Sequence, residues 1–268
     1  MAKVSSFIVY TSIFVFSLVS WVGLGMILPL NSSSSAAELN EIQERGYLMV
    51  AVKDNVRPLA FRDESGNLQG LEIDLARHLA EELLGRADAV RFQPVANRDR
   101  LKVVLERKVD MAIARMTATA SRSRLVDFTA PYYLDGTSIV TKDRSVQKDK
   151  DLSGKKVAIL NGSSTIATVR YVLPRVRLVG VNSYEEGRSL VESGGAIGFA
   201  ADNSVLAGWV QEYPQYRMVP VWLSGEALCV VMTKGLQNNK LWDRVNAALA
   251  RWKAEGWLQE RAKYWGLP

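Results

Sequence analysis

The sequence predicts an α/β protein in which two lobes each contain parallel strands joined by helices. One observation is a repeated alternation of short apolar runs with amphipathic segments between residues 48 and 114. Another is that this alternation restarts after the charged segment 142–150. Such alternation indicates parallel pairing with right-handed crossovers. The chain has 268 residues, 48% of them hydrophobic, which is enough for packed cores.

The first series contains the clearest helix, at residues 70–85. Leucine recurs every four residues from Leu71 to Leu83, and Gly85 is placed to end the helix. The other elements expected here are strands at 48–52, 90–95 and 109–114, a hairpin at 61–71, and a helix at 99–106 with Leu101, Val104 and Leu105 inward.

The second series is expected to form the second lobe. Its predicted strands are 137–141, 156–160, 176–181, 196–200, 216–222 and 227–232, and its predicted helices are 165–172, 184–192 and 203–212. A final helical segment, 240–267, is broken at Gly256. Cys229, the only cysteine, lies in a run typical of a buried strand, so no intramolecular disulfide is possible.

Residues 1–30 are almost entirely apolar, with Lys3 as their only charge. Their length lies between a signal-peptide core and a bilayer span. We favour an export signal cut near Ser35-Ala36-Ala37, and an uncleaved membrane anchor remains the alternative. Both interpretations place the rest of the chain outside the cytoplasmic membrane, in the periplasm. The net charge of +6 is interleaved along the chain, so no nucleic-acid partner is expected.

The segment 110–133 has the features of an anion site at the end of a strand. An apolar run is followed by the hydroxyls of Thr117 and Thr119 and then by Arg122, whose planar guanidinium can hold a carboxylate through two hydrogen bonds. Small ligands bind at such strand ends in open α/β sheets. A plain alternative is that Arg122 pairs with Asp127.

Two further features suit the same kind of ligand. The segment 161–164, Asn-Gly-Ser-Ser, precedes a helix, where amide hydrogens and the Ser164 hydroxyl suit a carboxylate. Asp202 is the first charge after a buried strand and can accept an ammonium group. Ser164 or Asp202 could instead simply cap the following helix. Together with Arg122, these residues describe a site for an α-amino acid.

The sequence resembles the bacterial extracellular solute-binding proteins of family 3, which serve polar amino acid ABC transporters. The residues that carry the resemblance are G-L-E-I-D-L-A at 70–76, M-T-A-T-A-S-R at 116–122, V-D-F-T-A-P-Y-Y at 126–133, G-K-K-V-A-I-L-N-G-S-S at 154–164, A-A-D at 200–202, V-N-A-A-L-A-R-W-K-A-E-G-W at 245–257 and K-Y-W-G at 263–266.

The resemblance implies a type II periplasmic-binding-protein fold, with two α/β lobes joined by two crossover segments near 134–138 and 225–230. Residues 1–37 would be the signal peptide or anchor with a Ser-rich spacer, 38–134 the first part of lobe 1, 135–226 lobe 2 and 227–268 the return to lobe 1. The resemblance also assigns a carboxylate contact to Arg122 and Ser164, a polar contact to Thr117 and the ammonium contact to Asp202.

This chain departs from the family pattern where selectivity is determined. Val56 stands where relatives often have an aromatic residue, and Arg115 stands where Gly or Ser is usual. With Arg57 and Lys53 near the same opening, the pocket is expected to be positive and to favour an acidic or polar side chain, or a carboxylate that is not an amino acid. The alternative is that Arg115 pairs with a protein acid such as Glu72.

The function expected is that of a non-enzymatic, monomeric receptor that delivers an amino acid to an ABC transporter permease. No cofactor, metal site or catalytic residue is expected, and His78, the only histidine, is assigned a surface or packing role. The alternatives are an enzyme resembling cyclohexadienyl dehydratase on the same fold and a membrane-anchored sensor module.

Overall fold

The computed structural model of the chain describes residues 39–235 and 239–268. The expected export signal or anchor at 1–37 lies outside the described residues. Within the described ranges, no helix combines the length and the apolar character needed to cross a membrane.

Five strands form the first sheet, in the order β5-β1-β6-β13-β7. They are β1 (Leu48–Val52), β5 (Val90–Pro94), β6 (Met111–Ile113), β7 (Val126–Asp135) and β13 (Glu226–Thr233). Strand β1 pairs in parallel with β5 and β6, whereas β13 runs antiparallel to both β6 and β7. The carboxyl ends of β1 and β6 therefore lie at the same edge of the sheet, where Lys53 and Arg115 follow them.

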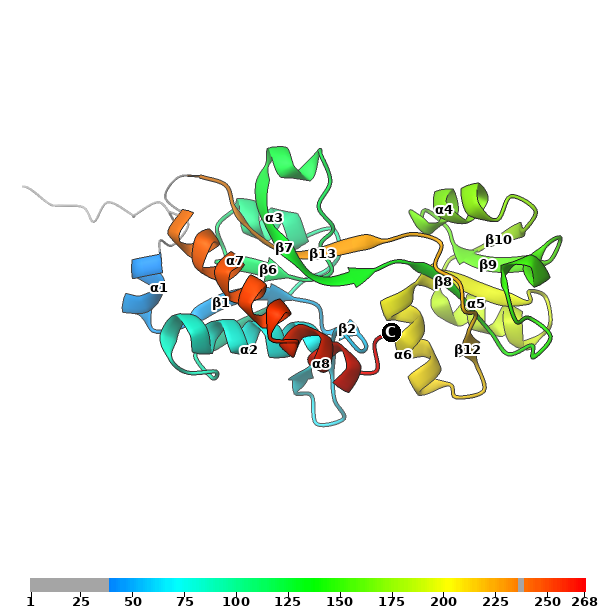
Figure 1. Ribbon diagram of the computed structural model, residues 1–268, viewed down its shortest axis with the longest axis horizontal. Coiled ribbons are helices and arrows are strands. Elements are labelled where there is room, and N and C mark those ends of the chain that lie inside the picture. The colour runs from blue at the N-terminus through cyan, green and yellow to red at the C-terminus, as the bar shows by residue number, and fades with distance from the viewer. Residues whose placement is uncertain (1–38, 236–238) are drawn as a thin grey trace, which may run out of the picture. The chain divides into compact units, whose positions relative to one another are not determined.

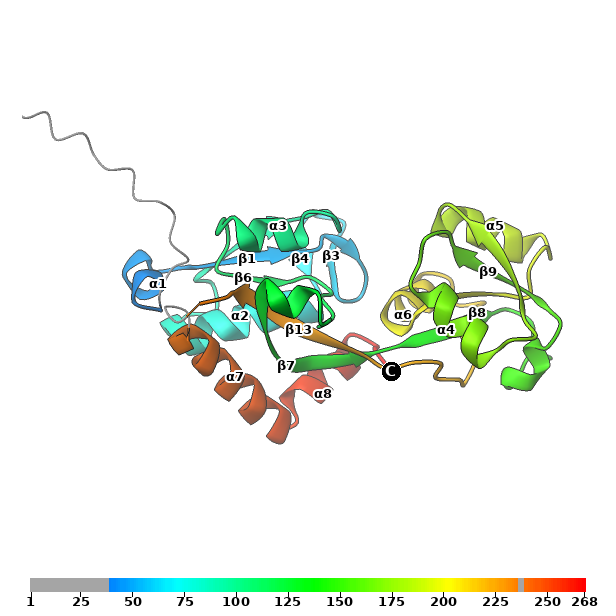
Figure 2. The ribbon, with the colours of Figure 1, turned by 90° about the horizontal axis from the view of Figure 1, so that it is seen from above.

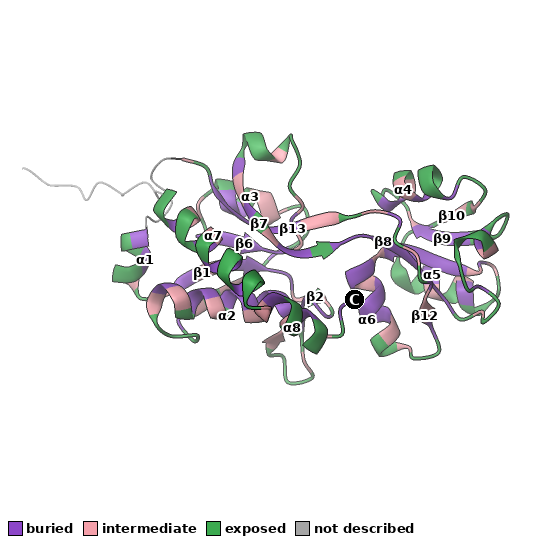
Figure 3. Cartoon of the chain, viewed as in Figure 1, coloured by how far each residue is buried: buried purple, intermediate pink, exposed green. Residues whose placement is uncertain are grey.

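Helices cover both faces of this sheet, as Figure 2 shows. They are α1 (Leu39–Arg45), α2 (Leu71–Leu84), α3 (Arg100–Leu105), α7 (Asn239–Ala254) and α8 (Trp257–Tyr264). The apolar stripes of α2, α7 and α8 share one buried cluster with the strands, while α3 contributes to a cluster on the other face. The strands are mostly buried (Figure 3), as expected for a sheet covered on both sides.

The second sheet also has five strands, in the order β10-β9-β11-β8-β12. They are β8 (Thr137–Thr141), β9 (Lys156–Leu160), β10 (Arg177–Val181), β11 (Gly198–Asp202) and β12 (Arg217–Met218). Its helices are α4 (Thr165–Val172), α5 (Tyr184–Glu192) and α6 (Asn203–Glu212), with the short 3-10 turn η2 (Asp149–Leu152) before β9. Strands β9, β10 and β11 are parallel, so the start of α4 and Asp202 lie at one sheet edge.

The chain passes between the two sheets twice (Figure 1). The first passage is at Gly136, between β7 and β8, and the second lies between β12 and β13, at residues 219–225. Within this segment, Val219 and Leu223 still donate main-chain hydrogen bonds to Ile139 and Thr137 of β8, so the passage itself follows Leu223. Gly136 has no room for a side chain, since an added Cβ would lie 2.1 Å from the Ser224 carbonyl oxygen.

Most predicted elements are confirmed. Helices α4, α5 and α6 have the predicted bounds, and Gly85 ends α2 with φ 76°. The hairpin is confirmed by β3 (Ala60–Arg62) pairing with β4 (Leu68–Gln69), to which β2 (Asn55–Val56) adds. Gly256 separates α7 from α8 at φ 81°.

Some predictions were wrong or incomplete. Leu105, expected inward, is 42% exposed because α3 ends there after little more than one turn. The expected strand 216–222 is reduced to β12, and α1, β2 and the ten-residue strand β7 were not predicted. Strand β7 depends on pairing with β13, which lies far along the chain and cannot be recognised from local sequence.

Candidate functional site

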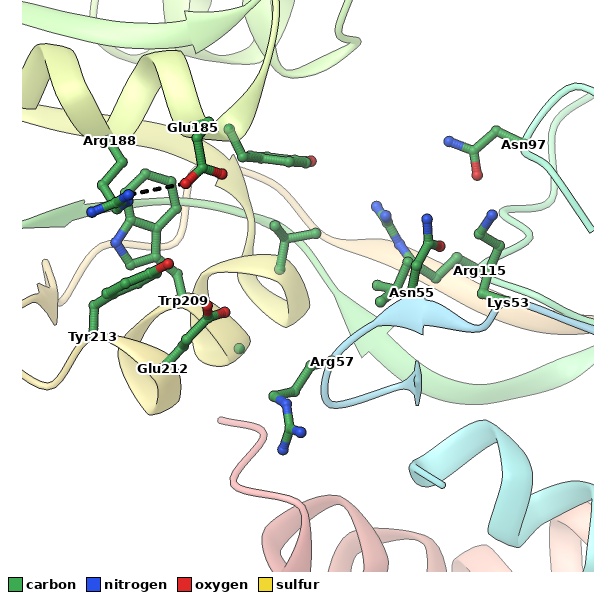
Figure 4. Close-up of a pocket in the computed structure, with 14 residues that line it drawn as sticks. Lys53, Asn55, Arg57, Asn97, Arg115, Glu185, Arg188, Trp209, Glu212 and Tyr213 are labelled. Carbon is green, nitrogen blue, oxygen red and sulfur yellow. Dashed lines mark hydrogen bonds and ion pairs between the residues drawn. The ribbon is translucent and has the colours of Figure 1, made fainter. Parts of the chain in front are cut away.

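A cavity of about 370 Å³ lies beside Arg115 and has the size of a small-molecule pocket. Residues that follow β1 and β6 form one side of it, and residues of α5 and α6 form the other (Figure 4). The lining residues are Lys53, Asn55, Val56, Arg57, Asn97, Arg115, Tyr184, Glu185, Arg188, Val205, Gly208, Trp209, Glu212 and Tyr213. Four of these are cations and two are acids, so the wall carries an excess of positive charge.

Of the predicted site residues, Arg57 and Arg115 line this cavity. The others are not among its lining residues: Thr117, Thr119, Arg122, Ser164 and Asp202. Arg115 adopts φ 50°, a left-handed conformation that favours glycine. The Arg57 guanidinium lies 3.8 Å from the centre of the Phe61 ring, which holds it at the edge of the opening.

Arg115 and Asp202 form an ion pair that joins the end of β6 to the end of β11. The Arg115 side chain is thus paired with a protein acid, as the alternative expected, but the acid is Asp202 and not Glu72. Glu72 Oε1 instead accepts from the main-chain nitrogen of Arg115, at 2.7 Å. Burial raises the pKa of Asp202, and the charge of Arg115 opposes that rise. Asp202 also precedes α6 without a side-chain capping bond, so its carboxylate is directed to Arg115 rather than to the helix.

Arg122 lies in the 3-10 turn η1 (Arg122–Arg124), partly buried. One guanidinium nitrogen donates to the Thr117 carbonyl oxygen at 3.0 Å, and the Arg122 main-chain nitrogen donates to Thr119 Oγ1 at 3.3 Å. Thr117 and Thr119 thus position Arg122, and no Arg122–Asp127 ion pair occurs among the described residues. Its remaining N–H groups are available for a carboxylate.

Ser164 is exposed at the start of α4, and its side chain makes no capping bond to the helix. Ser163 takes that role instead, because its Oγ accepts from the Thr165 main-chain nitrogen at 3.2 Å. A hydrogen bond with the Thr165 side chain opposes the rise in the pKa of Asp202. The start of α4 and Asp202, the two parts of the predicted lobe 2 site, therefore lie close together.

Sequence reasoning missed Arg100 and the buried position of Glu72. Arg100 donates to the carbonyl oxygens of Ala114 and Arg115, at 2.8 and 2.7 Å, and so holds the end of β6 in place. Glu72 is fully buried and accepts from Tyr132 Oη at 2.6 Å, and burial raises its pKa to about 7. Burial, and then the charge of Arg100, lowers the pKa of Lys53. These residues lie far apart in the sequence, so no local pattern predicts that they come into contact.

Within residues 39–235 and 239–268, no group of three or more His, Cys, Asp or Glu side chains is placed to hold a metal ion.

The model of the bacterial extracellular solute-binding proteins, family 3, matches residues 48–268. The chain belongs to this family. It is 29% identical over 210 residues to a glutamine-binding protein of Geobacillus stearothermophilus, covering 77% of this chain and 80% of that one. It is 26% identical over 206 residues to the ABC transporter arginine-binding protein 1 of Escherichia coli, covering 75% and 83%.

Solved structures show the same fold. An ancestral cationic amino acid solute-binding protein superposes with a TM-score of 0.73 at 28% identity, over 85% of this chain and 99% of that one. An ancestral amino acid-binding protein described as a precursor of cyclohexadienyl dehydratase gives a TM-score of 0.67 at 28% identity, over 86% and 100%. This family 3 protein therefore has the type II periplasmic-binding-protein fold, and its relatives are amino acid-binding proteins of ABC transporters.

Proposed function

We propose that this family 3 protein is a periplasmic receptor that captures an amino acid, or a closely related small carboxylate, and delivers it to an ABC transporter permease. The observation that supports this most is the partly buried Arg122, whose guanidinium is positioned by the Thr117 carbonyl with N–H groups left over. A positioned guanidinium is well suited to hold a carboxylate through parallel hydrogen bonds.

The charges around Arg122 favour an anionic group in the same place. Lys53, Arg100 and Arg115 are close enough to affect one another, and both Arg115 and Arg122 lower the pKa of Arg100 after the larger effect of burial. Partly buried cations that face each other repel, and a bound carboxylate relieves that repulsion. We assign the hydroxyl of Ser164, exposed at the start of α4, a further contact to the same ligand.

A receptor suits these residues better than an enzyme does. Glu72 is the carboxyl whose pKa, about 7, would suit an acid or base, but it is fully buried and hydrogen-bonded to Tyr132 and Arg115. A group in that position cannot reach a substrate. Turnover of prephenate or arogenate by the purified protein would show that the enzymatic alternative is correct.

The partners that follow are a small-molecule ligand and a membrane permease, with the receptor acting as a monomer. Along the chain, residues 38–134 and 227–268 would form lobe 1, and lobe 2 would be inserted between them at 135–226. A periplasmic location agrees with the extracellular character of the family. Amino-terminal sequencing of the exported protein tests whether a free receptor starting near Glu38 or an anchored form is made.

A thermal-shift screen of the purified protein against amino acids and small organic acids tests the proposal, because a ligand that binds only the folded state raises the melting temperature. Arg122→Ala should remove the carboxylate contact and weaken every ligand found by roughly 100-fold, about 3 kcal/mol. Arg124→Ala, at an exposed position in the same turn η1, is the matched control and should leave affinity unchanged. Equal effects of the two substitutions would contradict the role of Arg122.

A further inference from the structure

Arg115 holds an unfavourable backbone conformation. In the described residues, the non-glycine residues with positive φ are Arg107, at 56°, and Arg115, at 50°. A residue with a Cβ is strained there, and such strain persists only where the surroundings enforce it. Here the surroundings are Glu72, which accepts from the Arg115 main-chain nitrogen, and Arg100, which donates to its carbonyl oxygen.

The strained backbone directs the Arg115 side chain to Asp202, 87 residues away. In this ion pair the two side chains are 19% and 20% exposed, so water screens it only in part. Asp202 is the acid that sequence reasoning assigned to a ligand ammonium group. In this chain a guanidinium of the protein already lies against it.

Other acceptors near this point are also engaged by the protein. The carbonyl oxygens of Ala114 and Arg115 accept from Arg100. Asp135 accepts from the main-chain nitrogens of Gly136 and Ser204 and from the Ser204 hydroxyl. A ligand ammonium placed at Asp202 or Asp135 would have to displace one of these donors and would also face Arg115 and Lys53 across the cavity. Glu226, half-buried near Asp202 and Arg115, is the other acid at this point.

We propose that Arg115 takes the place of the ligand's ammonium group, so that this protein selects small organic carboxylates without an α-ammonium over the corresponding amino acids. This rests on the proposed function, in which Arg122 holds the carboxylate. A carboxylate without an ammonium group leaves the Arg115–Asp202 ion pair intact, and the surplus positive charge of the cavity wall attracts it. An α-amino acid pays to separate a partly buried ion pair.

Titration calorimetry with matched pairs tests the assignment: glutarate against L-glutamate, succinate against L-aspartate and propionate against L-alanine. The wild-type protein should bind the acid of at least one pair more tightly than its amino acid. Arg115→Gly frees Asp202 and suits the positive φ, so the variant should fold. Its preference within that pair should shift toward the amino acid by on the order of tenfold to hundredfold. Arg107→Gly, at the other positive φ, is the matched control and should leave the preference unchanged.

The possible failures are distinct. If wild-type protein binds the amino acids of all pairs more tightly than the acids, for instance because Asp135 or Glu226 accepts the ammonium, the role of Arg115 is refuted while the receptor function stands. An Arg115→Gly variant that folds, as judged by its melting temperature, but keeps the wild-type preference also refutes it. If neither protein binds any small carboxylate, the proposed function itself fails, and this inference with it.

Discussion

Gly208 offers a direct test of whether the two sides of the cavity must approach as closely as they do here. It lies in α6 and lines the cavity together with Arg57. A Cβ added at Gly208 would lie 2.3 Å from the Arg57 carbonyl oxygen, whereas ordinary contact begins at 3.4 Å. Since the obstacle is backbone and not a flexible side chain, Gly208→Ala must move α6 and the Arg57 loop apart by about 1 Å.

Gly208→Ala should affect the free energy of unfolding and the ligand affinity differently. Alanine favours a helix over glycine by about 1 kcal/mol, so the free energy of unfolding should not fall. Ligand affinity should fall by about tenfold or more, about 1.4 kcal/mol, because contacts made from both sides of the cavity are weakened together.

The assay is calorimetric titration with the ligand identified by thermal shift, combined with urea unfolding of the free protein. Gly225→Ala is the control, because a Cβ there meets no atom within 4 Å. Unchanged affinity in Gly208→Ala would refute the reasoning, since it would mean that ligand binding does not require α6 and the Arg57 loop to lie this close together. A large loss of stability would refute it differently, by showing that the contact supports the fold.

Two further predictions concern Glu72 and Gly70. Burial raises the pKa of Glu72 from 4.5 to about 7, so its ionisation destabilises the folded protein increasingly between those pH values and by a constant amount above them, on the order of 3 kcal/mol. The stability of Glu72→Gln relative to wild type should therefore rise between about pH 4.5 and about pH 7 in urea unfolding and stay constant above that, and a pH-independent difference would contradict this. Gly70→Ala should lower the unfolding free energy by about 3 kcal/mol, because φ is 123° and the new Cβ would lie 2.3 Å from the Leu59 carbonyl oxygen; an unchanged melting temperature would contradict this.

The sequence by itself determined the local elements. Helices α4, α5 and α6 were predicted with their bounds because an amphipathic period and its stop signals are contained in neighbouring residues. The motifs were also enough to recognise the family, because its residues recur in order along most of the chain.

Only the tertiary structure decided what depends on residues far apart in the chain. Strand β7 exists through its pairing with β13, and α3 ends early enough to expose Leu105. For Arg115 the sequence left two interpretations, a ligand contact or a pairing with a protein acid such as Glu72. The structure pairs its guanidinium with a protein acid, but that acid is Asp202, 87 residues away, because the strained backbone at the end of β6 directs it there. Strand pairing and ion pairing across a cavity are set by the spatial order of the sheets, which no local pattern contains.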